Sequence, residues 1–406
     1  MLEALERPAG RSGAAARARR PSRSAKESLR DLFLLDPEIT YLNHGAYGAT
    51  PRPVFAAFVR WQLELEREPV DFLSRNFTDR MAHAREVLAR YVGTGRDNIV
   101  YVNNGTVGLN IVARSMRLGP GDEVLTTDHE HGGIDRLWRC EAQRRRFDYV
   151  VRPIPLPVTT HQEFVEHFWA GVTERTRVIL ISHLTSPTSL VFPVKEICAR
   201  ARRAGILTVV DGSHVPGQLP LSIPDIDPDF YVGIAHKWLC APKGCAFLYA
   251  RPSAQGLLEP LVISWGWEPR NPGPSQFVEL HEWQGSRDVS AYLAVPDAIA
   301  FQQEHDWDAV RARCRALAMH AQTEIGRLTG MPAWHPPAPE WHGQIVCAPL
   351  PPGTDGAALA LRLRHEYHID VSVDPFRGRP RVRVSVQGYN DLDDIERLLD
   401  ALRRLI

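Results

Sequence analysis

The sequence predicts an α/β protein, with a large domain built on a mainly parallel sheet and a smaller C-terminal α+β domain. Between about residues 55 and 294, short apolar runs alternate with amphipathic segments of helical period. This alternation is typical of parallel strands that are covered by helices on both faces. After a proline-rich stretch at 332–339, the pattern changes to shorter strands and two further helices. A chain of 406 residues is long enough for two such domains.

The expected elements follow one another along the chain in the order that such a fold requires. The strands of the large domain are apolar runs, expected at 98–102, 123–127, 178–182, 207–210, 230–232 and 245–249. Its helices have apolar residues three and four positions apart, and they are expected at 55–68, 81–91, 107–116, 134–146 and 194–204. One long helix over 295–328 leads to the small domain, whose strands are expected at 343–348 and 381–386 and whose helices at 357–365 and 392–405.

These patterns divide the chain into five parts. Residues 1–27 are rich in Arg, Ala, Ser and Gly and poor in large apolar residues, which predicts a disordered tail. Residues 28–54 are expected to form an N-terminal segment that lies on the side of the small domain and the substrate. The large domain is expected over residues 55–294. The linking helix occupies 295–330 and the small domain 331–406. The pair Arg19-Arg20 has no apolar stretch after it, so we do not expect an export signal.

Composition limits the classes of function. The 48 basic residues balance the 48 acidic ones, which argues against binding to nucleic acid or to a membrane surface. No apolar stretch approaches the roughly 18 residues of a membrane span. The six cysteines include no CxxC pair, so we expect neither a disulfide framework nor a zinc site, and we expect a cytoplasmic location.

Chemistry that needs a lysine amine has few candidates, because the chain has only four lysines, at 26, 195, 237 and 243. Lys237 follows a predicted strand and lies between His236 and Trp238, in an apolar stretch where a lysine can form an imine. Asp211 ends another strand, 26 residues earlier. A lysine and a carboxylate at neighbouring strand ends suit pyridoxal 5′-phosphate (PLP), whose pyridinium nitrogen the carboxylate keeps protonated. The alternatives are a snorkelling surface lysine and an aspartate that caps a turn.

Two further strand ends carry polar sequences. The sequence NNGTVG at 103–108 joins a strand to a helix, and its small residues leave backbone amides free for an anion such as the phosphate of PLP. It is neither a P-loop nor a GxGxxG turn. The sequence DHEHGG at 128–133 clusters His and Glu, but it is not HExxH, and we expect no metal there. An imidazole from this loop could instead stack on a cofactor ring.

Together these motifs resemble the class V branch of the fold-type I PLP enzymes, and in particular the isopenicillin N epimerase-like group. The resemblance runs from about residue 41 to the C-terminus. The segments that carry it are YLNHGAYG at 41–48, DHEHG at 128–132, SHLTSPT at 182–188, VDGSH at 210–214, HKWLCAPKG at 236–244, EWQGSRD at 282–288 and RVRVS at 381–385. It implies a fold-type I transferase and a homodimer whose active sites lie at the subunit interface.

The resemblance also implies a role for each matching residue. Lys237 would form the Schiff base and carry protons, Asp211 would face the pyridine nitrogen and His131 would stack on the ring. His214 would lie near the phenolic oxygen, with Ser186 as a second candidate. The phosphate would be held by Gly105, Thr106 and His236, and by Gly285 and Ser286 of the neighbouring subunit. Arg383 would bind the substrate α-carboxylate through a bidentate pair, and His44 and Tyr47 would line the substrate side.

The sequence departs from its relatives at points that bear on the reaction. Ile234 and Ala235 replace polar or sulfur-containing residues before the His-Lys pair. His131 occupies a position that is often aromatic in epimerase-like members, whereas cysteine desulfurases have histidine there. The desulfurases also need a nucleophilic cysteine before the arginine strand, and residues 365–383 contain none. Desulfuration through a persulfide is therefore not expected.

The expected activity is PLP chemistry at Cα and Cβ of an amino-acid moiety in a specialised metabolite. We favour C–S β-elimination from an S-conjugated cysteine, which releases a thiol or sulfenate with pyruvate and ammonia. Epimerisation of the isopenicillin N type is the first alternative, followed by decarboxylative or oxidative deamination and transamination. A binding module without catalysis is disfavoured, because Lys237, Asp211 and Arg383 are all present.

Overall fold

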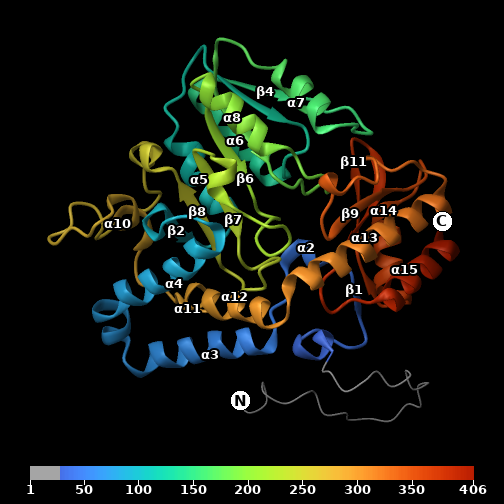
Figure 1. Ribbon diagram of the computed structural model, residues 1–406, viewed down its shortest axis with the longest axis horizontal. Coiled ribbons are helices and arrows are strands. Elements are labelled where there is room, and N and C mark those ends of the chain that lie inside the picture. Colours follow the sequence, from blue (N-terminus) through green and yellow to red (C-terminus); the bar gives the residue numbers. More distant parts are fainter. Residues whose placement is uncertain (1–27) are drawn as a thin grey trace.

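The computed structural model describes residues 28–406, and the tail expected over 1–27 lies outside this range. A seven-stranded sheet forms the centre of the larger part of the molecule (Figure 1). Its strands lie in the order β2-β8-β7-β6-β5-β3-β4. β8 is antiparallel to both of its neighbours, and every other pairing in the sheet is parallel. The mainly parallel sheet expected from the sequence is thereby confirmed.

Six of the seven strands of this sheet agree closely with the apolar runs expected from the sequence, and the edge strand β4 was not expected. The seven strands are β2 (Ile99–Val102), β3 (Glu123–Thr127), β4 (Asp148–Arg152), β5 (Thr176–Ser182), β6 (Leu207–Asp211), β7 (Phe230–Ile234) and β8 (Ala246–Ala250). The helices around them are α3 (Arg52–Arg67), α4 (Phe77–Val92), α5 (Gly105–Ser115), α6 (Gly132–Arg145), α7 (His161–Trp169), α8 (Val194–Arg203), α9 (Ile223–Ile226), α10 (Gln276–Glu282), α11 (Ser290–Leu293) and α12 (Val295–Glu304).

Alternate residues of each strand enter two separate cores, one on each face of the sheet. In β5, Val178 and Leu180 pack with residues of α5 and α6, whereas Ile179 and Ile181 pack with residues of α4, α7 and α8. Successive side chains of a strand point to opposite faces, so a strand that is buried on both faces must be apolar throughout. This requirement explains the unbroken apolar run of β5.

The C-terminal part consists of a three-stranded antiparallel sheet with helices packed on it. Its strands are β9 (Ile345–Pro349), β11 (Ser372–Phe376) and β12 (Arg379–Ser385), in the order β11-β12-β9. Its helices are α13 (Trp307–Thr329), α14 (Gly356–Glu366) and α15 (Leu392–Leu405). The N-terminal strand β1 (Thr40–Tyr41) pairs with β10 (Ile369–Asp370), and the short helix α2 (His44–Tyr47) follows it. Among residues 28–406, no helix has both the length and the apolar character that a membrane span requires.

The single long helix expected over 295–328 is wrong, because two helices, α12 and α13, occupy this region. Asp306 interrupts the helical path with a left-handed backbone (φ 46°), and its side chain accepts a hydrogen bond from the amide of Ala309 as the N-cap of α13. Aspartate tolerates this conformation and favours the N-cap position, which accounts for the break.

Candidate active site

Lys237 lies in the turn that follows β7, at the edge where the parallel strands end. Its side chain is largely buried, whereas Lys195 and Lys243, the other lysines of the described range, are exposed. Burial is the main cause that lowers the pKa of Lys237 to about 8, and the charge of Arg383 lowers it further. Asp211 acts in the opposite direction. The amine is thus more readily uncharged than that of an ordinary lysine.

Asp211 ends β6 beside this turn, and its side chain is 3% exposed. One carboxylate oxygen accepts a hydrogen bond from the amide of Ser213 (2.9 Å). Within residues 28–406, no basic side chain lies within ion-pair distance of the Asp211 carboxylate. A buried carboxylate without a cationic partner is a suitable place for a protonated ring nitrogen.

His214 joins the two strand ends. Its Nε2 lies 3.2 Å from Nζ of Lys237, and its Nδ1 accepts a hydrogen bond of 3.2 Å from the indole of Trp238. The imidazole is buried, and its pKa lies well below the usual value, because of burial first and the nearby charge of Lys237 second. His214 therefore carries no charge. The sequence analysis placed Trp238 in a motif but gave it no role.

The expected phosphate turn begins helix α5. The side chain of Asn104 caps the helix by accepting from the amide of Val107 (2.9 Å), and Gly105 and Thr106 are the first helical residues. Their amides lack partners inside the helix and can bind an anion. A Cβ on Gly105 would lie 2.9 Å from Oγ of Ser213, so only glycine fits this close approach without movement.

His236 is held by the backbone next to Lys237. Its Nδ1 lies 2.8 Å from the carbonyl oxygen and 3.3 Å from the amide nitrogen of Cys245, so the backbone of Cys245 fixes the orientation of the ring. Burial lowers the pKa of His236 to about 4. A phosphate dianion beside the ring would favour its charged form.

Arg383 lies on β12 and reaches across to the large domain. Its guanidinium donates to the carbonyl oxygen (2.9 Å) and to Oγ (3.1 Å) of Ser186. The side chain is buried, its Nε has no hydrogen-bond partner, and it forms no ion pair with any described carboxylate. Arg381, two residues earlier on the same strand, instead forms an ion pair with Asp374. A buried cation without a counter-charge is suited to bind the carboxylate of a ligand.

His131 forms the N-cap of α6, where its ring accepts a hydrogen bond from the amide of Gly133 (3.2 Å). The ring is exposed, and Asp211, Lys237 and Arg383 are its electrostatic neighbours. Partial desolvation is the main cause that lowers the pKa of His131. The structure thus brings His131 to the same strand ends as the predicted lysine and aspartate.

Glu130, next to His131, is a buried carboxylate that the sequence analysis did not single out. It accepts hydrogen bonds from Oγ of Ser182 (2.6 Å) and from Oγ1 of Thr127 (2.8 Å), which end two strands of the sheet. Burial raises the pKa of Glu130 to about 7. The DHEHG motif could have indicated this residue, but nothing in the sequence showed that its side chain turns inward.

His44 and Tyr47 were expected to line the substrate side, and the structure places His44 differently. His44 is fully buried beneath the lysine turn, with Nε2 3.0 Å from the carbonyl oxygen of Lys237 and Nδ1 3.0 Å from the hydroxyl of Tyr389. Burial lowers its pKa to about 3, so it is a neutral donor to that carbonyl. We therefore revise the role of His44 from substrate contact to support of the lysine backbone. Tyr47 is 74% exposed.

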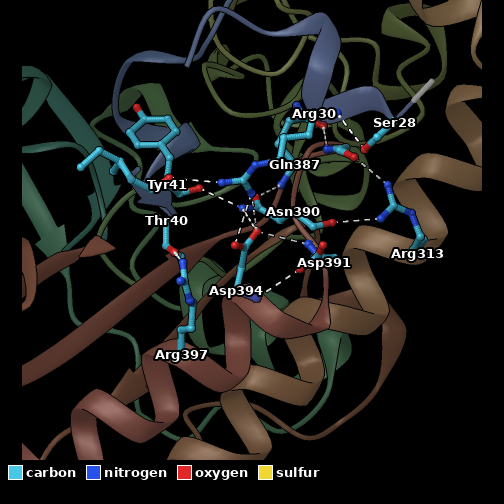
Figure 2. A network of polar contacts seen from close by, with 12 residues as sticks. Ser28, Arg30, Thr40, Tyr41, Arg313, Gln387, Asn390, Asp391, Asp394 and Arg397 are labelled. Carbon is cyan, nitrogen blue, oxygen red and sulfur yellow. Dashed lines mark hydrogen bonds and ion pairs between the residues drawn. The ribbon is translucent and has the colours of Figure 1, made fainter. Parts of the chain in front are cut away.

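A buried polar network anchors the segment that carries His44 (Figure 2). Asp394 is fully buried and forms an ion pair with Arg30 (3.2 Å). The amide of Asn390 donates both to Asp394 (3.1 Å) and to the carbonyl oxygen of Tyr41 (3.0 Å). The N-terminal segment is thereby fixed to helix α15 and to the loop before it, which holds His44 in place.

Gly285 and Ser286 follow helix α10. Gly285 has a left-handed backbone (φ 102°), and the side chain of Ser286 is exposed. Their expected role, which is to complete the phosphate site of a neighbouring subunit, stays a prediction.

The sequence of this chain matches the profile of one known family, described as aminotransferase class-V, over residues 40–398. The chain belongs to the class-V aminotransferase family. This chain is 36% identical to the isopenicillin N epimerase of Streptomyces clavuligerus, and the alignment covers 93% of this chain and 98% of that protein. It is 37% identical to the same-named protein of Amycolatopsis lactamdurans, with 94% and 99% covered.

More distant class-V proteins carry other names. An L-cysteine desulfhydrase of Arabidopsis thaliana is 26% identical, with 91% of this chain and 88% of that protein covered. Among solved structures, the cystine C–S lyase C-DES in complex with its product cysteine persulfide gives a TM-score of 0.78 at 22% identity, covering 91% of this chain and 98% of that one. This structural likeness confirms the fold-type I architecture.

The residues at the strand ends fit PLP, the cofactor of class-V enzymes. Three features match the aldehyde, the ring nitrogen and the phosphate of PLP: a largely buried amine, a buried carboxylate without a cationic partner, and a helix N-terminus that begins with a glycine. The protein is a PLP-dependent enzyme. Its predicted site residues Lys237, Asp211, His214, His131 and Gly105 come together in the structure, and Arg383 reaches them from the small domain.

Proposed function

We propose that the enzyme cleaves the C–S bond of an S-conjugated cysteine by β-elimination, within a specialised metabolite. Bound PLP supplies an electron sink for the pair of electrons that the broken Cα–H bond leaves behind. Lys237 binds the cofactor and, once released, takes the proton from Cα. Arg383 binds the α-carboxylate and so fixes which Cα bond faces the lysine.

The observation that carries this proposal is the placement of His131 together with the absence of an accessible catalytic thiol. His131 is an exposed titratable group beside Lys237, able to give a proton to the leaving sulfur. Five of the six cysteines are buried, and Cys140 is exposed on α6, about two turns from the start of that helix. With no thiol to accept sulfur, the Cβ–S bond breaks with its electron pair on sulfur. A thiol, pyruvate and ammonia are then the products after hydrolysis.

Epimerisation at Cα is the second candidate, and the identity of 36–37% to isopenicillin N epimerases over almost the whole chain favours it. It requires the same base, Lys237, and return of a proton to the opposite face of Cα. The two reactions differ in the fate of Cβ, which one experiment can follow.

The test is incubation with a panel of S-substituted cysteines and aminoadipyl-cysteinyl peptides in deuterated water. β-Elimination predicts equimolar thiol and pyruvate, which Lys237→Ala should abolish. Inversion at Cα with deuterium incorporated and no pyruvate would instead support the epimerase. Borohydride reduction followed by peptide mapping should place the cofactor on Lys237, and a label on Lys195 or Lys243 would refute the assignment of the lysine.

We further propose a two-fold dimer in which Gly285 and Ser286 complete the phosphate site of the partner. This rests on the family resemblance and on the exposure of Ser286. Mixing inactive Lys237→Ala protomers with inactive Ser286→Asp protomers should restore activity, because one of the two sites in each mixed dimer is intact. An active monomer in sedimentation at assay concentration would contradict the proposal.

A further inference from the structure

Trp238, His214 and Lys237 form a short chain of hydrogen bonds under the active site. The indole Nε1 of Trp238 lies 3.2 Å from Nδ1 of His214, and Nε2 of the same imidazole lies 3.2 Å from Nζ of Lys237. Trp238 is 0% exposed and His214 is 2% exposed, so bulk water does not compete for the contact between the indole and the imidazole. The proton on the imidazole is therefore placed by its two hydrogen-bond partners, Trp238 and Lys237.

The donors and acceptors allow one arrangement of these protons. An indole N–H can only donate, so Nδ1 of His214 must accept and carries no proton. A neutral imidazole has one N–H, which is then on Nε2 and points at Nζ of Lys237. An ammonium group has only donors, and two donors would face each other at 3.2 Å. The contact is a hydrogen bond only when Lys237 is an uncharged amine.

The charges around the chain agree with this arrangement. Lys237 faces His214, Asp211 and Arg383, and burial with the charge of Arg383 outweighs the opposing effect of Asp211 on its pKa. His214 faces Lys237, Arg383 and His131, all of which disfavour a second proton on the imidazole. The neutral imidazole and the neutral amine therefore support each other.

We propose that Trp238 is a positioning residue that fixes the Nε2–H tautomer of His214 and thereby favours the uncharged, nucleophilic form of Lys237. This rests on the proposed role of Lys237 as the lysine that binds PLP. An uncharged amine is the form that attacks an aldehyde, so the apoprotein is prepared to capture its cofactor. The same Nε2–H is available to the phenolic oxygen of PLP, near which His214 is expected to lie.

The first test reads the tautomer directly in wild-type protein and needs no variant that must fold. Full-length apoprotein is labelled with ¹⁵N-histidine, and the His214 signals are identified by their loss in His214→Gln. At pH 9 we expect a protonated Nε2 and an unprotonated Nδ1 that accepts a hydrogen bond. A proton on Nδ1, or a charged ring, at this pH would overturn the proposal.

The second test measures the amine. The rate at which an acylating reagent modifies Lys237 in apoprotein is followed against pH by peptide mass spectrometry. In Trp238→Phe, Nδ1 of His214 can take the proton and Nε2 can accept from the ammonium, so the apparent pKa of Lys237 should rise by roughly one unit. Trp341→Phe is the matched control, because Trp341 is equally buried. Its indole donates to the carbonyl oxygen of Thr159 (3.3 Å) and not to His214.

An unchanged pKa of Lys237 in folded Trp238→Phe would contradict the proposal, as would an equal rise in Trp341→Phe. Both tests use apoprotein without substrate. A failure of the proposed reaction, or a cofactor found on another lysine, is therefore recognised separately by the product panel and by borohydride mapping.

Discussion

Arg383 donates a hydrogen bond of 2.9 Å to the backbone oxygen of Ser186, which joins strand β12 of the small domain to a loop that follows β5 of the large domain. The bond uses one nitrogen of the guanidinium and leaves Nε buried without a partner. The position of the arginine is thus set by the protein, while part of its hydrogen-bonding capacity remains for a ligand.

Replacing Arg383 by lysine should lower kcat/KM for an amino-acid substrate by at least about 10²-fold, roughly 2.7 kcal/mol, because an ammonium cannot form the bidentate pair. Arg381→Lys should change activity little, since Arg381 is paired with Asp374. Steady-state kinetics of both variants check this. Equal losses, or normal turnover of a substrate whose α-carboxylate is amidated, would contradict the role of Arg383.

Asp211→Asn should retain some cofactor but lose rate by about 10³-fold or more, because the buried charge opposite the ring nitrogen is lost. Single-turnover kinetics at saturating cofactor separate this loss from weaker binding of PLP. Activity within about tenfold of wild type, about 1.4 kcal/mol, is incompatible with the assigned role.

Gly48→Ala should weaken PLP binding by at least about tenfold, since a methyl group there requires the lysine turn to move. Gly48 has a φ of 73°, and a Cβ would lie 2.1 Å from the carbonyl oxygen of His236. Gly244→Ala is the control, because Gly244 has a similar φ of 86° with no atom within 4 Å of its Cβ. Equilibrium titration of both apoproteins with PLP measures the effect, and equal affinities would show that the clash is relieved elsewhere.

Lys237→Met should stabilise the apoprotein at pH 7 by about 2–3 kcal/mol. The pKa of Lys237 is lowered to about 8 in the folded protein, whereas an unfolded chain titrates near ~10.4. Between these values the unfolded state binds more protons, so wild-type stability rises with pH. The destabilisation that the charged Lys237 causes in the folded protein is complete below pH 8 and is lost above about pH 10.5.

Denaturant unfolding at pH 7 and pH 10 tests this dependence. The stabilisation by Lys237→Met should be largest at pH 7 and should shrink toward pH 10. Lys195→Met replaces an exposed lysine and serves as the control. A difference between wild type and Lys237→Met that does not change with pH would show that packing, rather than charge, is the cause.

Much of this site can be predicted from the sequence, because the ends of buried strands can be located from their apolar runs. The apolar runs that end at Asp211 and precede Lys237 require buried strands, and parallel strands place their carboxyl ends at one edge. The different roles of Arg381 and Arg383 cannot be predicted from the sequence, because the two side chains share one face of a strand. Asp374 lies opposite Arg381 in the register of β11 and β12, and pairing between strands depends on contacts that a single sequence does not state.

Trp238 and His44 were harder to interpret for a related reason. The indole of Trp238 reaches His214 only because the backbone turns after β7, and His44 reaches the Lys237 carbonyl from the other end of the chain. Both residues belong to motifs that the sequence analysis noted. Their partners depend on tertiary packing rather than on local pattern.

The anchoring of the N-terminal segment has a consequence for the order in which the chain folds. Asn43, next to His44, donates to Asp370, which is 327 positions away, and Asp394 holds the same segment near the end of the chain. Contacts of such long separation form late in folding, because a large loop must close first. The lysine turn therefore gains its full support only after segments that are 327 positions apart have come together.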